Sequence, residues 1–173
     1  MTAMTTRTLP VTYRDWSLGY GKPKPAPAYD EAEARRRFEA RETLTVLVGD
    51  PDRPHQVMTV KLGGEVVAVH WLDPHNRPVL EHVFAHLDGV EDLFLERTAL
   101  KTYNQTEPSP TDQATHNEVW YYRPAGTFTA VRKSVGLDDQ ENSSGTIDEV
   151  TLAGLFEPVP RFGAWESLLR ADR

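Results

Sequence analysis

Histidine is the residue type whose spacing suggests chemistry first, because five of the six histidines fall between residues 55 and 86. Two imidazoles can share a metal ion when their element brings them to one side, as i and i+4 do in a helix. His82 and His86 have that spacing, but in a strand they would lie ~13 Å apart, too far for one ion. The chain contains no HxH or HExxH motif and no cysteine. We therefore predict no metal site and no cofactor.

A second possible acid–base group consists of a histidine and a carboxylate. If residues 73–78 form the loop of a regular hairpin, His70 lies opposite Glu81 on the neighbouring strand. A carboxylate beside an imidazole raises its basicity and fixes its tautomer, which suits a general base. A cross-strand His–Glu pair on a solvated sheet face is the alternative interpretation. His70 and Glu81 are thus the candidate catalytic residues if the protein is an enzyme.

Aromatic side chains are the third candidate group. Trp71, Phe84, Trp120 and Tyr122 all fall in segments that read as strands. Inward-facing aromatics can line a cup for a small apolar ligand, and they can equally well fill a packed core. They are the candidate ligand-binding residues.

The element that must position most of these side chains is a run of strands from residue 57 to 103. Apolar, β-rich segments alternate with turn sequences, including Gly63-Gly64 and Asp88-Gly89. Both residues of a tight hairpin turn need positive φ, so Gly-Gly and Asp-Gly between β-rich segments indicate hairpins. This pattern predicts an antiparallel meander. One segment, 79–87, also has helical spacing of its apolar residues; we favour a strand there because both flanking segments are strands.

The remaining chain predicts two helices and further strands. A helix should begin after Asp30, which can cap it, with Glu33 completing a capping box. Segments 44–49, 117–123, 127–135 and 147–156 read as strands, whereas 104–116 and 137–146 read as polar loops. Trp165, Leu168 and Leu169 have helical spacing and predict a short C-terminal helix. The expected fold is mainly β: a meander closed into a small barrel or sandwich, since an open sheet exposes its edges.

Composition bounds the domain organisation and the cellular context. The 173 residues suit one β-rich domain at 29–173, preceded by an extended, proline-rich arm at 1–28. The net charge of −7 disfavours nucleic-acid binding, which requires a basic face. The sequence has neither an apolar signal-peptide core nor a run of about 20 apolar residues, so we expect a soluble, cytoplasmic protein that does not bind membranes.

Two function hypotheses follow. The first is a small, acidic, non-catalytic binding protein that engages a protein partner, as inhibitors and immunity-type proteins do. The second is a β-barrel that binds an apolar small molecule, as a carrier or as a cyclase- or isomerase-like enzyme. In the second, His70 and Glu81 supply acid–base chemistry and the aromatic side chains shape the cup. The sequence contains no nucleophile-elbow, phosphate-loop or dinucleotide motif that would favour a large enzyme class.

Overall fold

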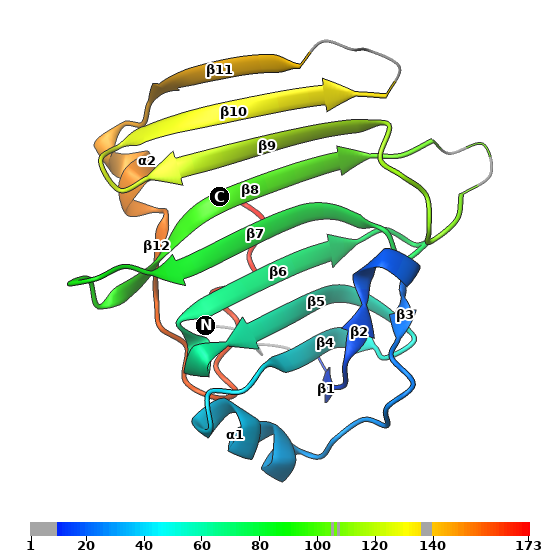
Figure 1. Ribbon diagram of the computed structural model, residues 1–173. Helices are drawn as coiled ribbons and strands as arrows, with labels where there is room; N and C mark the ends of the chain where they lie inside the picture. Colours follow the sequence, from blue (N-terminus) through cyan, green and yellow to red (C-terminus); the bar gives the residue numbers. More distant parts are fainter. Residues whose placement is uncertain (1–9, 105, 107, 136–139) are drawn as a thin grey trace, which may run out of the picture.

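The protein is built on one antiparallel sheet of ten strands. The computed structural model describes residues 10–104, 106, 108–135 and 140–173. Nine strands follow one another in the order β1-β4-β5-β6-β7-β8-β9-β10-β11, and β12 pairs with β8 beside this path (Figure 1). A separate two-stranded ribbon, β2–β3, lies between β1 and β4 in the chain. All pairings from β4 to β11 join consecutive strands, so the predicted antiparallel meander is confirmed.

The bounds of the strands match most of the predicted segments. They are β1 Val11–Tyr13, β2 Trp16–Ser17, β3 Lys22–Pro23, β4 Leu44–Asp50, β5 Arg53–Lys61, β6 Val66–Leu72, β7 Pro78–His86, β8 Asp92–Thr102, β9 His116–Arg123, β10 Thr127–Ser134, β11 Glu141–Thr146 and β12 Phe156–Pro158. The segment with ambiguous spacing is the strand β7, as favoured above. Its pairing with both neighbours outweighs the helical spacing of its apolar residues.

Alternation along the strands gives the sheet two distinct faces. One face, here called the inner face, carries a row of paired residues that includes Val46, Met58, Val69, His82 and Thr98. The opposite, outer face carries the row offset by one residue: Leu47, Val57, His70, Glu81 and Ala99. Because successive side chains of a strand point to opposite faces, neighbours such as His70 and Trp71 never share a face.

The two faces are covered by different parts of the chain. The inner face carries the main core, and residues 159–173, here called the C-terminal segment, pack against it through Trp165 and Leu168. Helix α1, Glu31–Glu39, joins this layer because Phe38 makes edge contacts with Phe162 and Trp165. A smaller cluster of Trp16, Leu47 and Val57 lies on the outer face. Figure 1 accordingly shows the C-terminal segment and the β2–β3 ribbon on opposite sides of the sheet.

The helices differ in part from the prediction. Asp30 caps α1 as expected, its carboxylate accepting the Glu33 N–H at 2.8 Å. The short helix near the C-terminus is α2, Glu149–Ala153, where a strand was expected; Asp148 caps it through the Thr151 N–H. The predicted helix around Trp165 is wrong, since 161–169 forms successive turns. Its apolar spacing instead serves packing on the inner face. None of the described helices is long and apolar enough to cross a bilayer.

The sheet is not closed, so the predicted barrel is not confirmed. Its end strands, β1 and β11, each pair on one side alone among the described residues. Strand β11 replaces part of the polar loop expected at 137–146; residues 136–139 lie outside the described residues. Five of its six residues are exposed. This edge carries polar rather than apolar side chains, which is one way for a sheet to tolerate an open edge.

Candidate functional site

The histidine–carboxylate pair forms as the hairpin register predicts. His70 on β6 lies opposite Glu81 on β7, with His70 Nδ1 3.3 Å from Glu81 Oε2. The Glu81 side chain is 12% exposed and the His70 side chain 10%, so both are largely removed from water. The approach lacks hydrogen-bond geometry, and Nδ1 has no hydrogen-bond partner among the described residues. The pair is therefore close but imperfectly aligned.

Burial, more than the neighbouring cations, sets the protonation state of His70. Arg97 on β8 contacts the second carboxylate oxygen of Glu81 through Nη2. Burial lowers the pKa of His70, and although Glu81 opposes this, Lys101 and Arg97 lower it further. His70 is therefore neutral at pH 7, with the positive charges of Arg97 and Lys101 nearby. This part of the outer face is more suited to an anion than the net charge of the chain implies.

The predicted aromatic residues lie on the inner face, away from His70 and Glu81. Trp71 contacts the ring of His82, with centroids 4.7 Å apart, and Phe84 is fully buried beside them. Trp120 packs on Phe128, with centroids 5.0 Å apart. Tyr122 packs against the main core, and burial raises its pKa.

The sheet thus separates the two predicted groups. Trp71, Phe84, Trp120 and Tyr122 share the inner face, whereas the imidazole–carboxylate pair lies on the outer face. One small ligand cannot contact both groups. The structure therefore does not bring the acid–base residues and the aromatic residues together on one face, because alternation places His70 and Trp71 on opposite sides.

A cavity of about 450 Å³ opens on the outer face, at the end of the sheet where the N-terminal region meets the loop 103–115. We call it the outer cavity. It is lined by Leu18, Gly19, Pro78, Lys101, Tyr103, Pro110, Asp112, Gln113, Ala114 and Asn117. Its volume is within the range of small-molecule sites, roughly 300–1,000 Å³. A second cavity of about 330 Å³ shares Asp112 and Gln113 with it.

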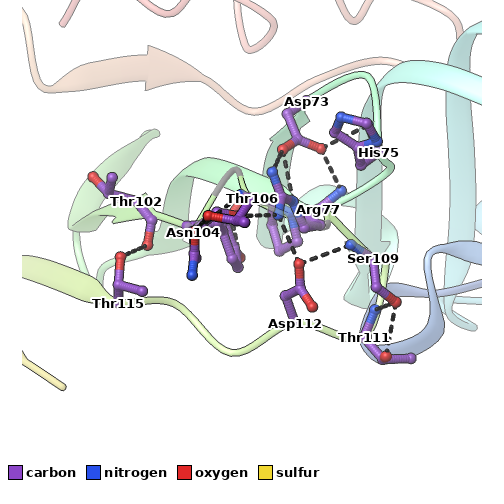
Figure 2. A network of polar contacts seen from close by, with 12 residues as sticks. Asp73, His75, Arg77, Thr102, Asn104, Thr106, Ser109, Thr111, Asp112 and Thr115 are labelled. Carbon is purple, nitrogen blue, oxygen red and sulfur yellow. Dashed lines mark hydrogen bonds and ion pairs between the residues drawn. The ribbon is translucent and has the colours of Figure 1, made fainter. Parts of the chain in front are cut away.

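A buried arginine holds the wall of the outer cavity in place (Figure 2). Arg77 is completely buried, and its guanidinium pairs with Asp73 at 2.6 Å and with Asp112 at 2.8 Å. It also lies over the ring of Tyr103, 4.5 Å from the centroid, and donates to the carbonyl of Asn104. Arg77 therefore ties the turn after β6 to the loop after β8. The burial cost of its charge is offset by two carboxylates rather than one.

The carboxylates of this network accept hydrogen bonds from Arg77 and from backbone N–H groups. Burial alone would raise the pKa of Asp73, but hydrogen bonds from Arg77 and from the His75 N–H hold it below its usual range. Asp112 accepts from Arg77 and from the Ser109 N–H at 2.7 Å. Because the single positive charge of Arg77 is shared by Asp73 and Asp112, the negative charge of Asp112 in the cavity wall is only partly compensated.

Two polar side chains of the outer cavity have spare binding capacity. Lys101 is partly buried, and no carboxylate among the described residues forms an ion pair with it. Asn117, directly opposite it on β9, has a buried amide oxygen without a hydrogen-bond partner in the described chain. The Lys101 ammonium can donate to a carboxylate or another small anion, and the Asn117 amide oxygen can accept from a donor group elsewhere on the same ligand.

Sequence reasoning missed Arg77, Lys101, Asp112 and Asn117. Arg77 lies in the turn DPHNRP and Asp112 in a polar loop 35 residues later, so no local spacing links them. The pattern Lys–Thr–Tyr at the end of β8 reads as an ordinary strand end. Only the pairing of β8 with β9 places Lys101 beside Asn117.

Within the part of the chain that the structure describes, no group of three or more His, Asp or Glu side chains could hold a metal ion. Comparison with protein-family models found no match, and comparison with curated proteins and with solved structures found none either. The function is therefore inferred from the geometry of this chain.

Proposed function

We propose that the protein is a small-molecule binding protein whose ligand is a small organic anion, such as a carboxylate, held in the outer cavity. The observation that carries this proposal is an open cavity of about 450 Å³ lined by an amine that no described carboxylate neutralises. A charged group in a partly buried site is normally paired, so an unpaired Lys101 supports an anionic ligand.

The other walls define the rest of the ligand. Leu18, Pro78 and Pro110 offer apolar surface, and Asn117 and Gln113 offer amide groups. An aromatic or short aliphatic acid would place its carboxylate at Lys101 and its hydrocarbon part against the leucine and prolines. Sites that orient a small ligand typically combine a largely apolar wall with a small number of precisely placed polar groups.

The His70–Glu81 pair offers a catalytic extension of this proposal. Ala99 pairs with Glu81 and precedes Lys101 by two residues on β8, which is ~7 Å along the strand. The imidazole is neutral at pH 7 and could accept a proton from a ligand that extends along the outer face. Enzymatic activity of the isomerase type is thus an extension of the binding proposal, and binding does not depend on it.

Engagement of a protein partner, the other hypothesis from sequence, has less support. The exposed large apolar side chains each lie on a different part of the described chain: Val11, Tyr20, Leu62, Leu100, Tyr121, Val135 and Val150. Isolated exposed apolar residues are normal for a soluble protein and do not form a docking patch.

Titration with benzoate tests the proposal. Benzoate carries the proposed carboxylate and a flat apolar group, and its binding can be followed by the amide NMR signals of residues that line the outer cavity. We expect saturable shifts at Gln113, Ala114 and Asn117. Lys101→Gln should weaken binding by about tenfold, because it removes one charge-assisted hydrogen bond.

A matched control is Lys61→Gln, which removes an exposed lysine from β5, outside the lining of the cavity. This variant should bind benzoate as the wild type does. Equal loss in both variants would indicate a general effect of net charge, and unsaturable or absent shifts at the cavity residues would overturn the proposal.

A further inference from the structure

The side chain of Arg173 is buried against the inner face of the sheet, which is an unusual place for an arginine. The side chain is 2% exposed, and its Nη2 lies 2.6 Å from Glu157 Oε1. The guanidinium carbon lies 5.3 Å from the centroid of the Phe84 ring, within the ~6 Å range of a cation–π contact. A carboxylate and an aromatic face together form a recognised binding arrangement for an organic cation.

The surroundings contain more polar groups than Arg173 satisfies. His82 is 1% exposed and Thr98 is 7% exposed, and the two lie opposite each other on β7 and β8. Among the described residues, His82 Nδ1 and Arg173 Nε have no hydrogen-bond partner, whereas the Thr98 side chain lies beside the Tyr122 hydroxyl. Buried polar atoms are almost always paired, so two unpaired atoms on one face indicate a site that its present occupant fills imperfectly.

The positive charge of Arg173 acts on the imidazole of His82. Burial, together with this charge, lowers the pKa of His82 to about 4. The imidazole is therefore neutral at pH 7 and does not repel a cation. Among the described residues, Glu157 is the one carboxylate paired with Arg173, so it carries the charge needed for one cationic group.

Arg173 belongs to the C-terminal segment, which is held on the inner face by contacts other than those of Arg173. Gln56 on β5 donates to the carbonyl of Leu169 at 2.8 Å, and Trp165 and Leu168 are buried against the core. Beyond Leu169, residues 170–172 are exposed. Arg173 could therefore leave its site through movement of residues 170–173, without detaching the rest of the C-terminal segment.

We propose that the inner face carries a second ligand site, specific for an alkylguanidinium or alkylammonium group, and that Arg173 occupies this site in the structure. Glu157 provides the counter-charge and Phe84 the aromatic face. An external ligand exchanges with the Arg173 side chain. This site is independent of the outer cavity, because the two lie on opposite faces of the sheet.

Methylguanidinium is the probe, because it reproduces the group that Arg173 inserts. Arg173→Ala should bind methylguanidinium saturably, with a rise in Tm and a shift of the His82 ring signals. The wild type should bind the same probe at least about tenfold more weakly, because the probe must first displace Arg173. In the wild type, the Arg173 Nε–H signal should lose its protection from solvent exchange as the probe is added.

Two controls keep the proposal falsifiable. Arg170→Ala removes an exposed arginine paired with Asp172 and should leave the affinity at the wild-type value. Glu157→Gln combined with Arg173→Ala should abolish binding. If the double variant does not fold, the wild-type exchange measurement decides. The proposal is overturned if Arg173→Ala does not bind the probe saturably, if it binds it unchanged without Glu157, or if the probe leaves the wild-type Arg173 signal protected.

Discussion

At the scale of single residues, the inner and outer faces use histidine in different ways. His70 on the outer face lies 3.3 Å from a carboxylate, with two cations nearby. His82 on the inner face lies between Trp71 and Phe84 and has a cation as its charged neighbour. Burial lowers the pKa of both imidazoles, so both are neutral at pH 7. Neither protonation state could be inferred from the sequence, because the sequence does not show which neighbours each histidine meets on its face of the sheet.

The depressed pKa of His82 predicts acid lability. The unfolded chain has a histidine pKa of 6.5 and the folded chain about 4, so the unfolded state binds the proton first as the pH falls. The stability that neutral His82 contributes is fully present above pH 6.5 and is lost between pH 6.5 and 4. The difference corresponds to roughly 3 kcal/mol.

Urea unfolding at several pH values measures this loss. His82→Leu should show a flatter pH dependence over the same window. His70 also titrates, but it is present in both proteins and cancels in the comparison. An identical pH dependence in wild type and variant would contradict the assignment.

At the scale of elements, the outer cavity depends on a contact between the N-terminal region and two loops. Asn76 in the turn after β6 donates to the carbonyl of Gly21 at 2.9 Å. Arg77, the next residue, pairs with Asp112 in the loop 103–115. The arm predicted at 1–28 therefore includes residues that form part of the cavity, and Val11–Tyr13 pairs with β4. Whether 29–173 folds as a domain without this arm remains a prediction from sequence.

The contact between the N-terminal region and the two loops is tightest at Gly21. Its φ is +55°, and a Cβ there would lie 2.7 Å from the Cβ of Pro110 and 2.9 Å from that of Asn76. Gly21→Ala should lower the free energy of unfolding by about 1–3 kcal/mol and weaken benzoate binding, because the cavity wall must shift. Gly19→Ala is the matched control for stability alone, since a Cβ at Gly19 meets nothing within 4 Å but Gly19 also lines the outer cavity. Chemical denaturation measures both, and equal stabilities would mean that this contact does not form in solution.

At the scale of the whole molecule, the C-terminal segment covers part of the inner face of one open sheet. The segment returns after β12 and runs along the inner face (Figure 1). There Tyr13 stacks on Phe162, and Phe38 of α1 contacts Trp165. The sheet therefore shares one main core with both ends of the described chain. This sharing indicates a single cooperative unit.

Leu168 tests that cooperativity. Leu168→Ala should lower the free energy of unfolding by roughly 2–4 kcal/mol, because its side chain is completely buried. Leu169→Ala should cost less, since Leu169 is partly exposed and its carbonyl still accepts from Gln56. Tryptophan fluorescence and far-UV circular dichroism should report the same transition in both variants. An earlier fluorescence transition would show that the C-terminal segment detaches before the sheet unfolds.

The sequence by itself determined the meander hairpins and the first helix, although not α2, β11 or the turns at 161–169. Turn glycines between β-rich segments fixed the hairpins, because Gly63, Gly64 and Gly89 all have positive φ. The hairpin register fixed His70 opposite Glu81, and Asp30 fixed the start of α1. Each of these features depends on residues close in the chain, so a pattern of neighbours is sufficient to predict it.

The tertiary structure alone decided where the chemistry lies. Strand alternation placed Trp71 and His70 on opposite faces, and the long-range returns of the chain brought Lys101, Asp112 and Arg173 to their sites. Closure of the sheet was also undecided by local pattern, because it depends on sheet curvature and on whether β1 and β11 meet. Contacts between residues distant in the chain are set by packing of the whole fold, and no spacing in the sequence records them.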